Sequence, residues 1–167
     1  MFLVNSRPDI CFVVNTLSQH MVEPHHIHWI GAKNLLRYLR GTITYGLRYT
    51  AGDVRLFGYT NVDWAGNVED RKSTFGCYFS LGSASISWMS RKQKSVALST
   101  VEAEYIATSM ASCEAVWLRK LFSELFGLTL DTTVILCNNQ RRDSIIEESR
   151  IRRLLQQIDV IWDMVSR

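Results

Sequence analysis

Two segments near the start of the chain carry apolar residues at helical spacing. In the first, residues 8–21, the apolar positions are Ile10, Val13, Val14 and Leu17. Pro8 opens this segment, and a proline suits the first turn of a helix. The second segment, residues 27–42, has a broad apolar face and a glycine near its end, which is typical of a helix stop. Two amphipathic helices are therefore predicted ahead of residue 43.

Beyond residue 44 apolar and polar positions alternate, as they do along half-buried strands. Strands are predicted over residues 45–50, 54–60, 73–81 and 83–90, separated by short breaks that contain glycine. Antiparallel hairpins are the economical connection across such short breaks.

A long helix and a further strand follow these hairpins. The helix is predicted over residues 100–126 and ends at Gly127. Its apolar stripe consists of Ala103, Ile106, Ala107, Met110, Trp117, Leu121 and Leu125. A strand over 132–137 comes next, then helical segments over 141–148 and 151–165. This order predicts an α/β fold with a mixed sheet and flanking helices, divided into a helical domain (1–43) and an α/β domain (44–167).

Composition narrows the class of protein. Apolar residues make up 47% of the 167 positions and charged residues 21%, which is typical of a soluble globular protein. No apolar run approaches the roughly 18 residues of a membrane span, and the apolar start is too short for a secretory signal. We therefore expect no membrane partner and an intracellular location, in the cytoplasm or the nucleus.

Burial is expected for the cysteines and for most tryptophans. The cysteines are far apart in apolar runs, so they are interpreted as buried thiols and not as a disulfide or zinc framework: Cys11, Cys77, Cys113 and Cys137. Trp29, Trp64 and Trp117 are interpreted as core residues. Trp88 has the same interpretation, with a position near a nucleic-acid strand as the alternative.

Positive charge is clustered, although the net charge of +3 is small. Basic pairs stand beside predicted turns in four segments: 71–76, 90–95, 140–144 and 149–153. The candidates for contact with nucleic acid come from the first two: Arg71, Lys72, Arg91, Lys92 and Lys94. Long basic side chains at such places can reach the phosphates of a nucleic acid. The alternative interpretation is that they solvate the ends of loops.

Three distant positions converge if the strands over 54–60 and 132–137 are neighbours. The first strand ends near residue 61, the long helix begins near residue 100, and the last strand ends near residue 138. Two metal ions about 4 Å apart need several carboxylates at such a place, because dications repel each other without negative ligands. Acids at these positions would therefore suit metal-dependent hydrolysis of a phosphodiester.

Seven ordered motifs relate the chain to a known family. They are RPDICFVVNTLSQHM, HWIGAKNLLRYLRGT, GYTNVDWAG, DRKSTFGCYF, ISWMSRKQKSVALSTVEAEYIA, EAVWLRKLFSEL and VILCNNQ. In order and spacing they resemble the last part of the polyprotein of copia-type retrotransposons, where the end of the reverse transcriptase precedes a ribonuclease H domain. The resemblance covers about residues 7–140 and implies a ribonuclease H-like fold. Because it weakens past residue 140, we expect the fifth strand and the final helix of that fold to be missing.

The resemblance places metal-binding acids at three positions of this chain. They fall on Asn61, Glu104 and Asn138, so only Glu104 retains an acid. Such acids bind Mg²⁺ or Mn²⁺ in the family, and the resemblance therefore implies weak or absent metal binding here. The two asparagines are compatible with natural decay of a retroelement and with engineered silencing of a nuclease.

Two further acids near the predicted site have separate interpretations. Glu102 fits a capping box with Ser99 and so has a structural role, which leaves Glu104 as the surviving site residue. Asp63 stands two positions beyond Asn61 and is a candidate substitute for the missing acid, because residues two apart in a strand point to the same side. Turn chemistry is the alternative role of Asp63, since turns favour aspartate.

Three functions are compatible with the sequence. The first is a retroelement-derived ribonuclease H-like domain that is catalytically inactive and retains binding to RNA/DNA hybrid. The second is an active metal-dependent ribonuclease with a rearranged site of Asp63, Glu104 and Asp159. The third is a reused scaffold that binds a protein partner at an open sheet edge. The first is favoured, because the octahedral geometry of Mg²⁺ tolerates little displacement of a ligand.

Overall fold

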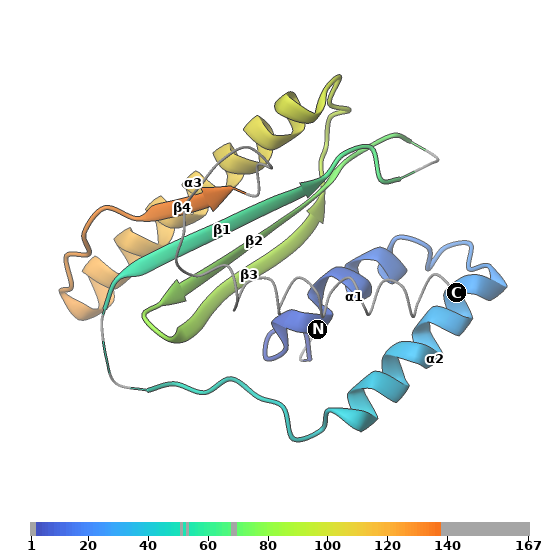
Figure 1. Cartoon of the computed structure of the whole chain (residues 1–167), viewed down its shortest axis with the longest axis horizontal. Coiled ribbons are helices and arrows are strands. Elements are labelled where there is room, and N and C mark those ends of the chain that lie inside the picture. The colour runs from blue at the N-terminus through green and yellow to red at the C-terminus, as the bar shows by residue number, and fades with distance from the viewer. Residues whose placement is uncertain (1–2, 51, 53, 68–69, 138–167) are drawn as a thin grey trace. The chain divides into compact units, whose positions relative to one another are not determined.

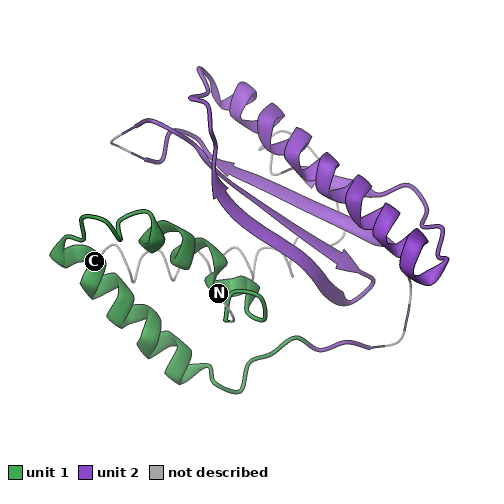
Figure 2. Ribbon diagram, turned by 180° about the vertical axis from the view of Figure 1, so that it is seen from behind, with its two compact units in different colours: residues 1–47, 141–167 green, residues 48–140 purple. Residues whose placement is uncertain are grey.

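The computed structural model describes residues 3–50, 52, 54–67 and 70–137. After a short 3₁₀ turn its elements follow in the order α1, α2, β1, β2, β3, α3 and β4 (Figure 1). The described residues form two compact units, 3–47 and 48–137 (Figure 2). Unit 1 is helical, and unit 2 combines a sheet with a long helix.

Unit 1 contains the 3₁₀ turn over Pro8–Ile10, α1 over Cys11–Ser18 and α2 over His26–Gly41. Both predicted amphipathic helices are present. The first is shorter than predicted, because its opening residues form the 3₁₀ turn and the α-helix ends at Ser18. Three buried apolar side chains form the core of this unit: Ile10, Val13 and Leu35.

A buried ion pair joins the chain just before α1 to the end of α2. The guanidinium of Arg7 donates to both carboxylate oxygens of Asp9, from Nε at 3.0 Å and from Nη2 at 2.8 Å. It also donates to the backbone oxygen of Thr42 at 3.1 Å and to its Oγ1 at 2.8 Å. Tyr38 donates its hydroxyl to Oδ2 of Asp9 at 2.8 Å. Because Arg7 and Asp9 are buried, little water competes for these bonds.

The ionisation of Asp9 and that of Tyr38 are both coupled to this network. Burial opposes ionisation of Asp9, but the hydrogen bonds from Arg7 and Tyr38 hold the pKa of its carboxyl below the usual value. Burial, together with the hydrogen bond to Asp9, raises the pKa of Tyr38 to about 12. The carboxylate therefore stays charged and the phenol stays neutral at ordinary pH.

Unit 2 is built on a four-stranded mixed sheet with the order β3-β2-β1-β4. The strands are β1 (Leu56–Asp63), β2 (Thr74–Leu81), β3 (Ala84–Lys92) and β4 (Val134–Cys137). β1 pairs antiparallel with β2, and β2 with β3, whereas β4 runs parallel to β1 (Figure 1). The prediction of a mixed sheet is confirmed. α3 supplies the long crossover that a parallel neighbour requires.

The prediction of a strand over residues 45–50 is wrong, because this segment has no regular secondary structure. Side chains tie it to the β2–β3 hairpin. Tyr49 Oη donates to the backbone oxygen of Ser85 at 3.2 Å, and Thr50 Oγ1 lies 2.7 Å from Ser83 Oγ. A strand requires a ladder of backbone hydrogen bonds, and alternating apolar residues do not supply one by themselves.

α3 spans Thr100–Phe126, the range that the apolar pattern predicted. Ser99 caps it by accepting a hydrogen bond from the N–H of Glu102 at 3.1 Å, and the Glu102 carboxylate accepts from the N–H of Leu98 at 2.7 Å. The predicted capping box is thus present, with Glu102 reaching one residue further back than usual. Gly127 has a left-handed φ of 65° and ends the helix as predicted.

The buried face of α3 differs from the predicted apolar stripe. Its buried residues are Ala103, Ala107, Ala111, Ala115 and Leu118. From the predicted stripe, Met110, Trp117 and Leu125 are exposed. Small side chains at every fourth position let the helix backbone lie close to the sheet, where the core includes Phe75 and Phe79. Residue size therefore decided which face is buried.

Several expectations about burial are wrong. Three tryptophans expected in the core are exposed: Trp29 by 59%, Trp64 by 43% and Trp117 by 54%. Lys33 Nζ lies 5.0 Å from the ring centre of Trp29, and the indole N–H of Trp64 donates to the backbone oxygen of Ala97 at 3.3 Å. Among the cysteines only Cys77 is buried as expected, whereas Cys11 is half-buried and Cys113 and Cys137 are exposed.

Other predictions have a more limited outcome. Within the described residues, every helix is too short or too polar to cross a membrane. The helices predicted over 141–148 and 151–165, and Asp159 with them, lie outside the described residues.

Gly58→Ala tests the close packing of β1 in the core. A Cβ at this position would lie 2.5 Å from Cε1 of Phe79 and 3.2 Å from Cγ1 of Ile135. Phe79 is fully buried, so we expect a loss of about 1–3 kcal/mol in the free energy of unfolding, measured with urea. Gly76→Ala is the matched control, because a Cβ there meets nothing closer than 3.8 Å. Equal stability of the two variants would contradict this prediction.

Asp9→Asn tests the buried ion pair of unit 1. The substitution leaves the positive charge of Arg7 without its carboxylate partner. We therefore expect the free energy of unfolding to fall by about 3 kcal/mol. Because folding lowers the pKa of Asp9, its contribution is complete above the unfolded carboxyl pKa and is lost as the pH falls below about 4. Hydrogen exchange of the α2 amides at neutral and acidic pH measures both effects. Asp131→Asn changes an exposed carboxylate of unit 2 and is the control, and equal exchange in both variants would refute the prediction.

Candidate functional site

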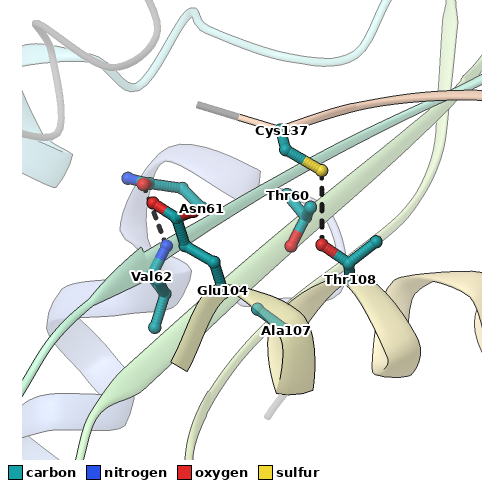
Figure 3. Close-up of a pocket in the computed structure, with 7 residues that line it drawn as sticks. All are labelled: Thr60, Asn61, Val62, Glu104, Ala107, Thr108 and Cys137. Carbon is teal, nitrogen blue, oxygen red and sulfur yellow. Dashed lines mark hydrogen bonds between the residues drawn. The ribbon is translucent and has the colours of Figure 1, made fainter. Parts of the chain in front are cut away.

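The end of β1 and the second turn of α3 bring two predicted site residues into one pocket. Asn61 stands one residue beyond Thr60, the last residue of β1 that pairs with β4. Glu104 follows Ala103, which is completely buried. The pocket is lined by Thr60, Asn61, Val62, Glu104, Ala107, Thr108 and Cys137 (Figure 3). The structure therefore brings together two of the three positions at which the resemblance places metal-binding acids.

Asn61 uses its side chain for a local hydrogen bond. Its amide oxygen Oδ1 accepts from the backbone N–H of Val62 at 2.9 Å (Figure 3). A carboxylate at this position would offer two negatively charged oxygens, whereas the amide offers one neutral oxygen. The bond to Val62 takes one of the two lone pairs of that oxygen, which leaves Asn61 a weak ligand for a cation.

Two polar contacts hold the walls of the pocket together. Thr108 Oγ1 and Cys137 Sγ lie 3.3 Å apart and link α3 to the end of β4 (Figure 3). Thr60 Oγ1 donates to a backbone oxygen of β2 at 3.2 Å. Thr108 and Cys137 were not expected from the sequence as lining residues. Their spacing in the sequence could have identified them. Thr108 lies about one helical turn after Glu104 and so shares its face of the helix, and Cys137 directly precedes Asn138.

Glu104 is the only carboxyl among the described residues that line the pocket. Across the described ranges, no group of three His, Cys, Asp or Glu side chains is placed to hold a metal ion. Asn138, the third predicted position, lies outside the described residues. The described part of the pocket therefore combines a single carboxylate with side chains that are neutral or weakly acidic.

Asp63 ends β1 and is not among the residues that line the pocket. Its carboxylate lies so close to Gly66 that a Cβ on this glycine would overlap it. Partial burial raises the pKa of the Asp63 carboxyl above its ordinary value. The Asp63 carboxylate therefore lies against the connection between β1 and β2, to which Gly66 belongs.

The basic residues predicted to contact nucleic acid lie at the same end of the sheet as Asn61. Arg71 and Lys72 belong to the β1–β2 connection, Arg91 and Lys92 end β3, and Lys94 follows. The pairing of β2 with β3 brings the two groups together, because both adjoin the first residues of β2. Three of the five residues are exposed: Arg71, Arg91 and Lys94.

Hydrogen bonds tie this end of the sheet to the start of α3. The indole N–H of Trp64 donates to the backbone oxygen of Ala97 at 3.3 Å. The backbone N–H of Gln93 donates to the oxygen of Ser73 at 2.7 Å, and its side-chain Nε2 donates to the oxygen of Ala103 at 3.0 Å. Gln93 and Ser73 are both buried. The basic residues and the pocket are therefore held by the same set of elements.

One acid lies within the basic group. Asp70 Oδ2 is 2.8 Å from Lys92 Nζ, and this hydrogen bond is the main reason that the pKa of Asp70 lies below its ordinary value. Asp70 thus offsets part of the positive charge at this end of the sheet.

Comparison with known proteins gives several related sequences. Secreted RxLR effector protein 161 of Plasmopara viticola is 50% identical over 117 residues, which are 70% of this chain and 82% of that protein. The retrovirus-related Pol polyprotein from transposon TNT 1-94 of Nicotiana tabacum is 40% identical over 163 residues, 98% of this chain and 12% of that protein. The corresponding polyprotein from transposon RE2 of Arabidopsis thaliana is 42% identical over 140 residues, 83% of this chain and 10% of that protein.

The chain spans about a tenth of the length of these transposon polyproteins. No protein-family model matches it, and no solved structure does. The transposon relatives nevertheless match most of the chain at 40–42% identity, in agreement with the ordered motifs. The chain therefore belongs to the family of copia-type retrotransposon Pol polyproteins.

Proposed function

We propose that this chain is a ribonuclease H-like domain of a retroelement polyprotein that has lost hydrolytic activity and still binds RNA/DNA hybrid. The sheet order β3-β2-β1-β4, with α3 between β3 and β4 in the chain, is compatible with that fold. In support, the end of β1 and the start of α3 meet in one pocket, where the family resemblance expects metal-binding acids.

The observation that carries the proposal is the neutral amide of Asn61 in the same pocket as Glu104. Two dications about 4 Å apart repel each other by about 16 kcal/mol at an effective dielectric constant of about 20. Several carboxylates are needed to offset that repulsion. Asparagine stands at two of the three family positions, Asn61 and Asn138, so the compensation falls far short. Hydrolysis through paired metals is therefore expected to fall by orders of magnitude.

Binding of RNA/DNA hybrid can remain after hydrolysis is lost, because it depends on the basic residues and not on the metal-binding positions. Proteins recognise such duplexes largely through backbone phosphates and 2′-hydroxyl groups. The basic residues at the pocket end of the sheet are placed to attract phosphates, and three of them are exposed. Asparagine in place of aspartate also lowers the repulsion of phosphates when no metal is bound. We expect weak, salt-sensitive binding that needs no divalent metal.

Loss of activity is tested by cleavage of a labelled RNA/DNA hybrid with Mg²⁺ or Mn²⁺. We expect wild type and Glu104→Ala to give the same background rate, because one family carboxylate does not hold a metal pair. Cleavage by wild type that Glu104→Ala abolishes would contradict the proposal. If Asp63→Ala abolished that cleavage too, the rearranged site would be favoured.

A variant with restored acids serves as the comparison for this test. Asn61→Asp combined with Asn138→Asp should raise the affinity for Mn²⁺ on the order of tenfold, because carboxylates supply the missing charge. An electron paramagnetic resonance titration measures the affinity. Adding Glu104→Ala to the double variant should remove the gain, and a gain that survives would place the ion elsewhere.

The triple change of Arg91, Lys92 and Lys94 to Ala tests binding. Fluorescence anisotropy with a labelled hybrid in EDTA should show an affinity lower by roughly tenfold or more at about 50 mM salt. The slope of log affinity against log salt concentration should become shallower by an amount that corresponds to about two lost phosphate contacts. The matched control removes the same charge from exposed positions of α2: Lys33, Arg37 and Arg40. No binding by wild type at low salt, or equal binding by the two triple variants, would contradict the prediction.

A further inference from the structure

Asp70 places a carboxylate in the middle of the basic group beside the β1–β2 connection. Its Oδ2 lies 2.8 Å from Lys92 Nζ, and its Oδ1 accepts the backbone N–H of Lys72 at 3.1 Å. One full positive charge and one backbone donor therefore converge on this carboxylate. An ammonium group and a backbone N–H are also the donors that proteins commonly offer to a phosphate.

Hydrogen bonds join the backbone of Asp70 and of Arg71 to Asn67. The N–H of Asp70 donates to Asn67 Oδ1 at 3.2 Å, and the N–H of Arg71 donates to the backbone oxygen of Asn67 at 2.9 Å. Arg71 has a φ of 55°, in the left-handed region that a residue other than glycine adopts only at some cost. The N–H of Lys72 precedes the paired residues of β2 and donates to the Asp70 carboxylate.

We infer that Lys92 Nζ and the Lys72 N–H form a binding site for a backbone phosphate of nucleic acid, and that Asp70 occupies this site in the free protein. The inference rests on the proposed binding of nucleic acid. A phosphodiester carries one negative charge and two non-bridging oxygens, so it can accept the same two hydrogen bonds as the carboxylate. Asp70 is then an internal competitor, and the protein binds nucleic acid less tightly because a phosphate must displace it.

The site is open to solvent, so one anion can replace the other without any opening of the core. The side chains of Lys92 and Asp70 are 24% and 39% exposed. Arg71 and Arg91, the sequence neighbours of Lys72 and Lys92, are exposed and add positive charge to this end of the sheet. An ion pair of this exposure contributes little to folding, so Asp70 can be replaced without unfolding the sheet.

Asp70→Asn and Asp70→Ala test the inference by anisotropy with the labelled hybrid over a range of salt. We expect both to bind about three- to tenfold more tightly than wild type at low salt, with a salt slope steeper by about one, because Lys92 gains a phosphate. Asp131→Asn removes the same charge near the start of β4, at the end of the sheet opposite Asn61. An equal gain in Asp131→Asn would overturn the inference, because it would show an effect of net charge alone.

A second test introduces Lys92→Gln both into the wild-type protein and into the Asp70→Ala variant. In wild type we expect it to weaken binding less than about twofold, because Asp70 already neutralises Lys92. In Asp70→Ala it should abolish the gain. An equal effect of Lys92→Gln in the two backgrounds would show that Asp70 and a phosphate do not share this lysine, and would overturn the inference.

A titration with inorganic phosphate distinguishes failure of this inference from failure of the proposed function. Titrated into Asp70→Ala, phosphate should shift the NMR signal of the Lys72 amide to saturation, and wild type should need much more phosphate. A phosphate response without hybrid binding by any variant would refute the proposed function and support a site for free phosphate. Hybrid binding that Asp70→Ala leaves unchanged, without a phosphate response, would overturn the inference and leave the proposed function standing.

Discussion

The close approach of α3 to the sheet is the constraint on which the rest of unit 2 depends. The helix presents alanine at every fourth position to the sheet: Ala103, Ala107, Ala111 and Ala115. Because these side chains are small, the helix packs tightly over the ring of Phe79, and Gly58 leaves the space that this ring occupies. The same approach brings Glu104 to the end of β1 and links α3 to β4. Core packing therefore sets the shape of the pocket, independently of the charge at residue 61.

Packing and charge are separate properties at this end of the molecule. An asparagine has nearly the shape of an aspartate, so Asn61 fits the pocket without the negative charge that an acid at this position would bring. The basic residues lie at the end of β3, just after it and in the β1–β2 connection, and they are not part of the pocket lining. In the proposed function, attraction for phosphates therefore does not require the carboxylates of a metal site. In the inferred phosphate site, Asp70 competes with that attraction, because its Oδ2 lies 2.8 Å from Lys92 Nζ.

Local signals predicted the elements well and their burial poorly. The ends of α3 and the three strands of the β1–β2–β3 ladder followed from caps, glycines and alternation. The segment over 45–50 alternates in the same way, yet it forms no strand, because no neighbour offers it a backbone ladder. Trp117 was expected in the core, but it is exposed because α3 buries its alanine face instead. The pocket was predicted in part, since order and motifs identified Asn61 and Glu104 but not Thr108.

The sequence by itself determined the features that act over a few residues. Ser99 and Glu102 cap α3, and Gly127 ends it, because each acts on backbone groups of its immediate neighbours. Ordered motifs likewise determined the family. Only the tertiary structure decided that the alanine face of α3 is buried and that Lys92 meets Asp70. These outcomes depend on distances between segments far apart in the chain, which strand register and the fit of side chains set, and no local pattern contains them.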